Sequence, residues 1–218
     1  MGTGPGAIAE DGSAVEVYAR LPAFGEPGIV HAAIPPGAEV LELGCGAGRV
    51  THPLLRLGHP VVAVDSSADM LDRVRGATKV LSRIEDLALD RRFPVVLLGS
   101  HLVNALDPVP LLASCARHVA ADGVVLIERY PPGWVDTALP GESALDGVTY
   151  RLRDVSHPGP GLLRATMDYE FDDHRWSHSF EVRGLNDDQL AEALTEVGLV
   201  VDEVLTEDRT WVLARPVR

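Results

Sequence analysis

Short apolar runs alternate with helix-like segments over residues 40–127. Four of the runs, at residues 40–43, 61–64, 95–98 and 124–127, are almost uninterrupted, which is typical of parallel strands covered on both faces. Between them, apolar residues recur three and four positions apart, as on one face of a helix. The alternation predicts an α/β fold with a doubly wound, mostly parallel sheet.

The remaining elements of this half are shorter. Residues 78–82 are predicted as a weak strand. A helix is predicted over residues 111–119, with Gly123 ending it before the next strand. Short helices are predicted within residues 15–34. Residues 1–12 are rich in glycine and small side chains, and are expected to be a frayed end without function.

Apolar and polar side chains alternate singly over residues 147–183. This pattern predicts an inserted antiparallel β meander, with Asp172 and Asp173 in one of its turns. After the meander, Asn186 is predicted to cap a last helix, and two closing strands are predicted over residues 199–214.

The composition is that of an ordinary globular protein, with 46% hydrophobic and 23% charged residues, so residues 1–218 are expected to form a single domain. The formal net charge of −13 and the lack of a Lys or Arg run argue against nucleic acid or an anionic membrane as partner. Cys45 and Cys115 are far apart, which argues against a disulfide framework or structural zinc. No leader-like or membrane-spanning apolar stretch occurs, so a cytoplasmic location is predicted.

The candidate chemistry centres on the run VLELGCGAGRV at residues 40–50. A buried strand leads directly into a turn with Gly44 and Gly46, where the backbone can take positive φ and lie close to a ligand. The helix that follows presents free N–H groups to the same place. A dinucleotide fingerprint needs G-x-G-x-x-G, but Arg49 holds the place of its third glycine. A pyrophosphate cradle, and with it a nucleotide-cofactor reductase, is therefore disfavoured.

Asp65 ends the next parallel strand, roughly 20 residues beyond the turn, the offset at which an acid meets a ribose in such folds. Its carboxylate can accept two hydrogen bonds from a vicinal diol. The competing interpretation is a turn or cap, because an acid before Ser66 and Ser67 is also a good turn former.

These residues make the chain resemble the class I S-adenosylmethionine (AdoMet) dependent methyltransferases, because the run E-L-G-C-G-A-G-R is similar to their motif I. The resemblance implies a Rossmann-like fold with an antiparallel last strand, AdoMet as cofactor, and a lid formed by residues 15–34. It implies these cofactor-binding residues: Glu42, Gly44, Cys45, Gly46, Asp65, Ser66, Met70, Ile84, Glu85, Asp86 and Ser100. The family usually has an acid for the adenine amino group right after the third strand. Arg83 stands there in this chain, so that role falls to Glu85, Asp86 or the Ile84 backbone.

The residues predicted to act on an acceptor follow the fourth and fifth strands. His101 lies at the carboxyl end of the fourth strand, the edge where doubly wound sheets bind ligands, and its imidazole can take a proton near neutral pH. It is the candidate catalytic base, with a packing role as the alternative. The candidate substrate-binding residues are Tyr18, Asn104, Glu128 and Trp134.

Several of these residues have a structural interpretation as well. Tyr18 and Trp134 also suit packing, and Glu128 also suits a surface carboxylate paired with Arg129. His174, Trp176, His178 and Phe180 share one face of a predicted strand, where no third ligand follows, so no metal site is predicted. That face is expected to cover the acceptor or to build a dimer.

The sequence thus predicts AdoMet-dependent methyl transfer to an oxygen or nitrogen of a small molecule. The protein is expected to be a monomer or a homodimer, without a nucleic acid or membrane partner. The alternative prediction is a protein of the same fold that binds AdoMet, or a partner, and has lost the chemistry.

Overall fold

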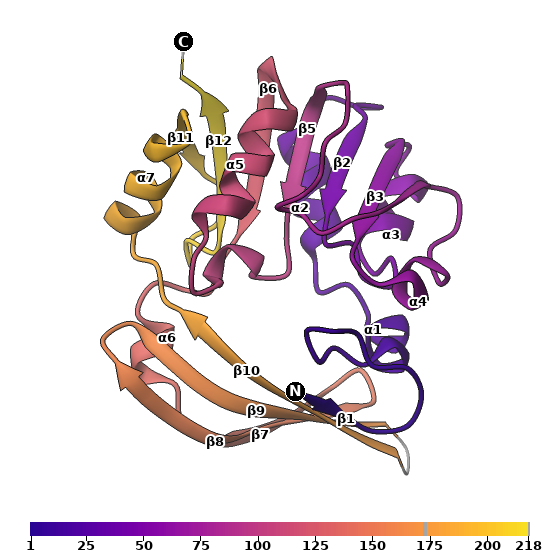
Figure 1. Cartoon of the computed structure of the whole chain (residues 1–218), viewed down its shortest axis with the longest axis vertical. Coiled ribbons are helices and arrows are strands. Elements are labelled where there is room, and N and C mark those ends of the chain that lie inside the picture. The colour runs from indigo at the N-terminus through magenta and orange to yellow at the C-terminus, as the bar shows by residue number, and fades with distance from the viewer. Residues whose placement is uncertain (172–173, 218) are drawn as a thin grey trace.

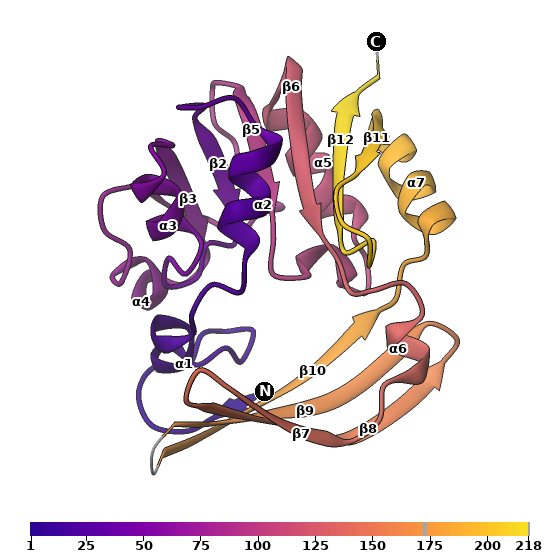
Figure 2. The ribbon, with the colours of Figure 1, turned by 180° about the vertical axis from the view of Figure 1, so that it is seen from behind.

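The computed structural model describes residues 1–171 and 174–217. The chain builds two β sheets, one above the other (Figure 1, and from behind in Figure 2). A seven-stranded sheet is flanked by helices, and a curved five-stranded sheet lies across the end at which its parallel strands stop. The space between the two sheets is where the candidate site lies.

The seven-stranded sheet has the order β11-β12-β6-β5-β2-β3-β4. Its strands are β2 (Val40–Leu43), β3 (Val61–Asp65), β4 (Thr78–Leu81), β5 (Phe93–Leu98), β6 (Val119–Glu128), β11 (Leu199–Val204) and β12 (Trp211–Pro216). β2 pairs in parallel with both β3 and β5, so the strand order reverses between β2 and β5. α/β sheets bind ligands outside the carboxyl ends of the strands at such a reversal. β12 is antiparallel to β6 and β11, as expected.

Helices cover both faces of this sheet. α5 (Val109–His118) and α7 (Asp187–Glu196) pack on one face, and α2 (Glu26–Ala33), α3 (Thr51–Arg56) and α4 (Ala68–Leu71) pack on the other. Each face has its own hydrophobic core. Within β2, Leu41 packs into the core on the first face and Val40 into the core on the second. Because both faces are buried, the strands are apolar on both sides, and the predicted doubly wound α/β fold is confirmed.

The five-stranded sheet is antiparallel, with the order β1-β10-β9-β8-β7. Its strands are β1 (Gly2–Thr3), β7 (Gly141–Leu145), β8 (Val148–Gly159), β9 (Leu162–Phe171) and β10 (His174–Arg183). The meander predicted at residues 147–183 is present, and β7 extends it at its start. Asp172 and Asp173, predicted to form a turn, lie outside the described residues.

The prediction of a frayed N-terminus is wrong. β1 pairs with β10, and the indole N–H of Trp176 donates to the carbonyl of Pro5 at 2.7 Å. α1 (Val15–Arg20) adds Val17 to the apolar cluster that contains Trp176 and Phe171. Trp176 is therefore buried under the N-terminal segment and is not part of an exposed face. Local sequence patterns do not reveal this pairing, because its two strands lie far apart along the chain.

Gly123 lies inside β6 and does not end α5, which already stops at His118. A Cβ on Gly123 would lie 2.8 Å from the carbonyl oxygen of Pro94 and 3.0 Å from that of Phe93. β6 can therefore approach β5 at this point only with glycine. Two short helical segments, the 3-10 helix η1 (Leu102–Asn104) and α6 (Trp134–Thr137), follow β5 and β6.

Candidate active site

A cavity of about 540 Å³ lies at the carboxyl ends of β2 and β3, where the N-terminal segment covers them. The residues predicted from the sequence that line it are Tyr18, Glu42, Gly44, Cys45, Gly46, Asp65, Ser66, Met70, Ile84, Glu85 and Ser100. The sequence did not indicate that Ala9, Glu10, Asp11 and Ser13 line it too. The segment expected to be frayed thus forms one wall of the cavity.

The glycine turn after β2 shapes the cavity. Gly46 has a φ of 55°, in the left-handed region, and its amide N–H donates to Oδ2 of Asp65 at 2.8 Å. A Cβ on Gly46 would have no neighbour nearer than a ring carbon of Tyr18 at 4.0 Å, so it would project into the cavity. The turn therefore leaves bare backbone facing the space where a ligand would lie.

Asp65 both forms the turn and faces the cavity. Besides the bond to Gly46, its Oδ1 accepts the amide N–H of Ser67 at 2.9 Å. Ser67, and not Ser66, caps α4, because its hydroxyl accepts the amide N–H of Met70 at 3.3 Å. Each carboxylate oxygen of Asp65 retains a second lone pair for a ligand, so the turn-forming and ligand-binding interpretations are compatible. Burial raises the pKa of Asp65.

Glu42 lies buried beneath the same turn, where its Oε2 accepts the hydroxyl of Thr51 at 2.5 Å. Burial raises the pKa of Glu42 to about 7, against the lowering effects of Thr51 and Arg49. A carboxyl in this state is stabilised as the anion by a cationic ligand group. The cavity thus offers one acid suited to a cation and a second acid suited to a diol.

At the other end of the cavity, Ile84 and Glu85 follow β4, and Arg83 lines the cavity beside them. Arg83 pairs with Glu85 at 3.2 Å. The side chain of Asp86 is 75% exposed and lies outside the lining of the cavity. Glu85 and the backbone of Ile84 are the adenine candidates that line the cavity.

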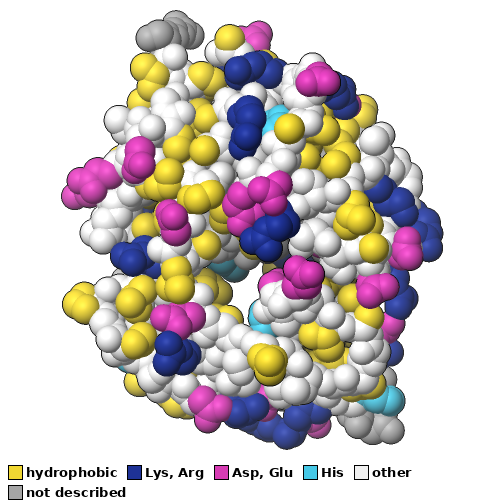
Figure 3. All heavy atoms as spheres, in the orientation of Figure 1, with side chains coloured by type: hydrophobic (Ala, Val, Ile, Leu, Met, Phe, Trp, Pro, Cys, Tyr) yellow, Lys and Arg dark blue, Asp and Glu magenta, His cyan; other side chains and the backbone are white. Residues whose placement is uncertain are grey.

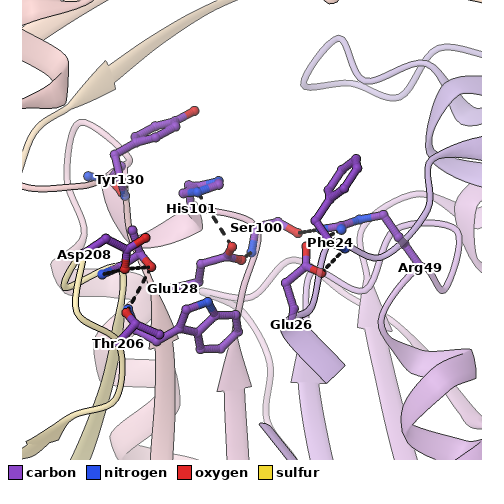
Figure 4. Close-up of polar contacts among 12 residues, drawn as sticks. Phe24, Glu26, Arg49, Ser100, His101, Glu128, Tyr130, Thr206 and Asp208 are labelled. Atoms are coloured by element: carbon purple, nitrogen blue, oxygen red, sulfur yellow. Dashed lines mark hydrogen bonds and ion pairs between the residues drawn. The ribbon is translucent and has the colours of Figure 1, made fainter. Parts of the chain in front are cut away.

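His101 and Glu128 meet at the ends of β5 and β6 (Figure 4). Nε2 of His101 lies 3.7 Å from Oε1 of Glu128, and Oε2 of Glu128 accepts the amide N–H of Ser100 at 2.5 Å. Ser100 and His101 both take left-handed backbone, with φ of 53° and 58°. Such backbone is costly for residues with a side chain and persists where the surrounding structure holds it, often at functional sites.

Burial sets the protonation of this pair. Burial, helped by the charge of Arg49, lowers the pKa of His101 to about 4, so its ring is neutral at pH 7. Burial and the neighbouring Glu26 raise the pKa of Glu128 to about 7. Glu128 is thus not the surface carboxylate paired with Arg129, which instead pairs with Asp187. A neutral imidazole beside a carboxyl that titrates near pH 7 can take up a proton from an acceptor.

A buried ion pair joins the cavity to this edge. Arg49 pairs with Glu26 at the start of α2, and Arg49 also lies over the ring of Phe24 and reaches Oγ of Ser100 at 3.4 Å (Figure 4). Sequence reasoning noted Arg49 only as the residue in place of a glycine and missed Glu26 altogether. No local motif connects the two, because only the fold brings the start of α2 over the turn.

An aromatic column continues from His101. Its ring stacks on Tyr130 with centroids 4.3 Å apart, and Tyr130 stacks on Trp134 at 4.5 Å. The prediction that Asn104 contacts an acceptor is wrong. Asn104 is fully buried, with its amide oxygen accepting the N–H of Tyr130 at 2.9 Å and its amide nitrogen donating to the carbonyl of Arg183 at 2.7 Å. Asn104 therefore positions Tyr130.

Figure 3 shows a hollow between the two sheets, and the side chain of His101, at this edge, is 35% exposed, so the space beside it is open to solvent. Tyr150 of β8 and Tyr169 of β9 approach it from the five-stranded sheet, and the hydroxyls of Tyr18 and Tyr169 are hydrogen-bonded. The sequence alternation predicted these strands but not which face turns toward the site, so both tyrosines were missed.

No three His, Cys, Asp or Glu side chains within residues 1–171 and 174–217 are grouped so that they could hold a metal ion. Over the same residues, none of the helices has the length and the apolar character required to cross a bilayer.

Comparison with known proteins identifies the domain. A family profile described as a methyltransferase domain matches residues 41–127. The fold matches that of an S-adenosylmethionine-dependent methyltransferase from Clostridium acetobutylicum ATCC 824, with a TM-score of 0.75, 14% identity, and coverage of 93% of this chain and 95% of that one. Residues 41–127 thus match a methyltransferase domain, and the chain has the fold of an AdoMet-dependent methyltransferase. The resemblance inferred from residues 40–50 and Asp65 is confirmed.

Two further comparisons describe proteins that are similar to this chain. It is 29% identical over 175 residues to the ubiquinone biosynthesis O-methyltransferase of Bradyrhizobium sp. strain ORS 278, which covers 77% of this chain. The chain spans 60% of the length of that relative. The sugar N-methyltransferase KedS8 of Streptoalloteichus sp. ATCC 53650 shares the fold, with a TM-score of 0.75, 18% identity, and coverage of 100% of this chain and 99% of that one.

Proposed function

We propose that this protein transfers a methyl group from AdoMet to an oxygen or nitrogen of a small-molecule acceptor. The observation that carries the proposal is the cavity that places a bare glycine turn, Asp65 and Glu42 together and extends to Ser100, next to the His101–Glu128 pair. A relative that methylates oxygen and a structural neighbour that methylates nitrogen support the same reaction class.

The polar groups that line the cavity match the polar groups of AdoMet. Glu42 would hold the ammonium of the methionine part, Asp65 the ribose hydroxyls, and Ile84 with Glu85 the adenine. The buried carboxyl of Glu42 gains a cation in this arrangement, and Gly46 leaves room at the turn. When bound, AdoMet supplies an electrophilic methyl carbon, which the lone pair of an acceptor displaces from sulfur.

The chain's own contribution to the reaction is to orient the acceptor and to remove its proton. His101, neutral at pH 7, is the group that accepts the proton, and Glu128 stabilises the resulting imidazolium across the 3.7 Å gap. Ser100 fixes Glu128 by its amide N–H, and Tyr130 fixes the plane of the His101 ring.

The five-stranded sheet and α1 act as the cover that restricts the acceptor to a small molecule. The outer face of this sheet carries exposed ion pairs, such as Arg164 with Glu181 and Arg175 with Glu170. Exposed ion pairs of this kind are typical of a solvated surface. They support a role of the sheet as a cover for the acceptor and not as a dimer contact. The oligomeric state and the cytoplasmic location stay predictions from the sequence.

Two measurements test the proposal. Titration calorimetry with AdoMet and S-adenosylhomocysteine should show binding of both, and mass spectrometry should detect methylated product with a panel of hydroxyl and amine acceptors. His101→Ala should lower kcat by about 10²-fold or more and leave AdoMet affinity nearly unchanged. His157→Ala, at the far end of β8, is the matched control. Absence of AdoMet binding contradicts the proposal, and binding without any turnover favours the inactive AdoMet-binding alternative.

A further inference from the structure

The charges around the acceptor space do not balance. Glu26 and Glu128 are both buried, and Arg49 is the cation that acts on Glu128. Arg49 is already paired with Glu26, so its charge is neutralised there. His101 adds no charge at neutral pH, because burial keeps its ring unprotonated. One carboxyl, that of Glu128, is thus left at the site without a cation.

One carboxylate oxygen of Glu128 accepts a hydrogen bond from the backbone, and the other faces the acceptor space. Oε2 is held by the amide N–H of Ser100 at 2.5 Å. Oε1 faces His101 at 3.7 Å, which is longer than a hydrogen bond. Since the residue is only 7% exposed, water compensates the missing partner poorly. A ligand cation placed at Oε1 would supply that partner.

The walls of the same space are aromatic. The chain has four tyrosines, and all four approach one another there. The ring of Tyr150 lies edge to face with that of Phe24, with centroids 6.4 Å apart, and with that of Tyr169, with centroids 5.8 Å apart. The side chain of Tyr169 is hydrogen-bonded to that of Tyr18. The fourth, Tyr130, stacks on both His101 and Trp134, and Arg49 lies over the ring of Phe24, so the faces of these two rings are already occupied. We call Tyr18, Tyr150 and Tyr169 the aromatic chamber.

The aromatic chamber remains uncharged over the physiological range, because burial raises the pKa of each of its tyrosines. Neutral aromatic faces attract cations through the ring quadrupole, and more strongly where water is excluded. Aromatic faces together with a carboxylate form the usual recognition site for an ammonium group. An anionic acceptor would instead meet the carboxylates of Glu26 and Glu128.

We infer that the acceptor of this methyltransferase is an amine, bound as its ammonium ion between the aromatic chamber and Glu128. The inference rests on the proposed function and narrows its acceptor class. One N–H bond of the ammonium breaks and one N–H bond forms at a ring nitrogen of His101, which leaves the lone pair of the acceptor nitrogen free to accept the methyl group. The His101 imidazolium, stabilised by Glu128, then loses the proton to water through the open side of the space.

A binding experiment tests recognition separately from turnover. Choline carries a quaternary ammonium, and 3,3-dimethylbutan-1-ol is its neutral isostere. Both are titrated by NMR into the protein saturated with S-adenosylhomocysteine. Choline should bind at least about tenfold more tightly. Glu128→Gln keeps an acceptor for Ser100 but loses the charge, and should reduce this preference severalfold. Glu203→Gln, on the exposed face of β11, should retain it.

A turnover experiment uses acceptors matched in size. Benzylamine should be methylated at least about tenfold faster than benzyl alcohol or phenol. Equal binding of choline and its isostere, or faster methylation of the alcohol or phenol, overturns the amine inference and leaves methyl transfer standing. Failure to bind S-adenosylhomocysteine overturns the proposed function itself, and the amine inference with it.

Discussion

The amide N–H of Ser100 donates to Oε2 of Glu128 at 2.5 Å, and this bond ties the turn after β5 to the end of β6. The tie holds a turn in which two successive residues with side chains take left-handed backbone, at a cost of about 1 kcal/mol or more for each. The position of His101, the candidate base, therefore depends on how β5 and β6 are held together at their ends.

Replacing Glu128 tests this tie. Glu128→Gln retains an oxygen for the amide of Ser100, whereas Glu128→Ala leaves that N–H without its partner. We expect Glu128→Ala to lower the free energy of unfolding by about 1–3 kcal/mol relative to Glu128→Gln. Urea unfolding at pH 6 measures the difference under conditions in which Glu128 is mostly protonated, so loss of its charge contributes little. Equal stability of the two variants would show that the turn does not depend on this bond.

Asp65 is expected to be the main polar anchor for the cofactor. Asp65→Asn replaces a carboxylate that can accept from two hydroxyls, and should weaken AdoMet binding about 10–100-fold. Titration calorimetry gives the dissociation constant. Asp69→Asn, on the exposed side of α4, is the matched control and should bind AdoMet like the unmodified protein. An unchanged affinity for Asp65→Asn would leave Asp65 with its turn-forming role only.

Much of the fold follows from local patterns. Strands such as β3 are buried on both faces and therefore read as continuous apolar runs, and the Asn186 cap is a capping box with Gln189 that local sequence reveals. The pairing of β1 with β10 could not be read in this way, because two-residue β1 has no periodicity and its partner lies far away along the chain.

The candidate site was predictable to the same degree. Gly46 and Asp65 belong to a motif of fixed spacing, and the structure brings them together. Glu26 and Tyr169 reach the site from other elements, and no spacing rule connects them to the motif. Asn104 was misjudged for a different reason. It does follow a strand, as predicted, but its side-chain amide hydrogen-bonds to two backbone groups. Those two partners are brought to it by tertiary packing, which the sequence does not reveal.

Two glycines outside the site should respond to alanine in opposite directions. Gly123→Ala places a Cβ 2.8 Å from a backbone oxygen of the neighbouring strand and should cost about 1–3 kcal/mol of stability. Gly28→Ala, inside α2, meets nothing within 4 Å and should stabilise the protein by about 0.5–1 kcal/mol. Thermal unfolding of both variants measures the shifts. If Gly123→Ala proves as stable as the unmodified protein, β6 has room to move away from β5.

AdoMet binding should release a proton near pH 6. Burial holds the pKa of Glu42 at about 7 in the free protein, so its carboxyl is mostly protonated at pH 6. An ammonium bound beside it favours the anion and expels about one proton. Calorimetry at pH 6 in two buffers of different ionisation heat measures the release. It should vanish at pH 8 and in Glu42→Gln.

The same raised pKa values predict how stability depends on pH. Glu42 and Glu128 have folded pKa values of about 7, above the ordinary value of 4.5, so the folded protein binds these protons more tightly than the unfolded chain. These two groups therefore make the free protein less stable as the pH rises from about 4.5 to about 7, with no further loss above that. Urea unfolding at several pH values across this window gives the free energy of unfolding as a function of pH. This free energy should fall less steeply with pH in Glu42→Gln than in the unmodified protein.

The pairing of β1 with β10 also bears on how the protein is made. Gly2 lies opposite His178, and almost the whole parallel sheet is encoded between them. During translation, residues 1–12 emerge before β10 and must wait for it before they can dock. The wall of the cofactor cavity is therefore completed late in synthesis, after the glycine turn that it covers has already emerged.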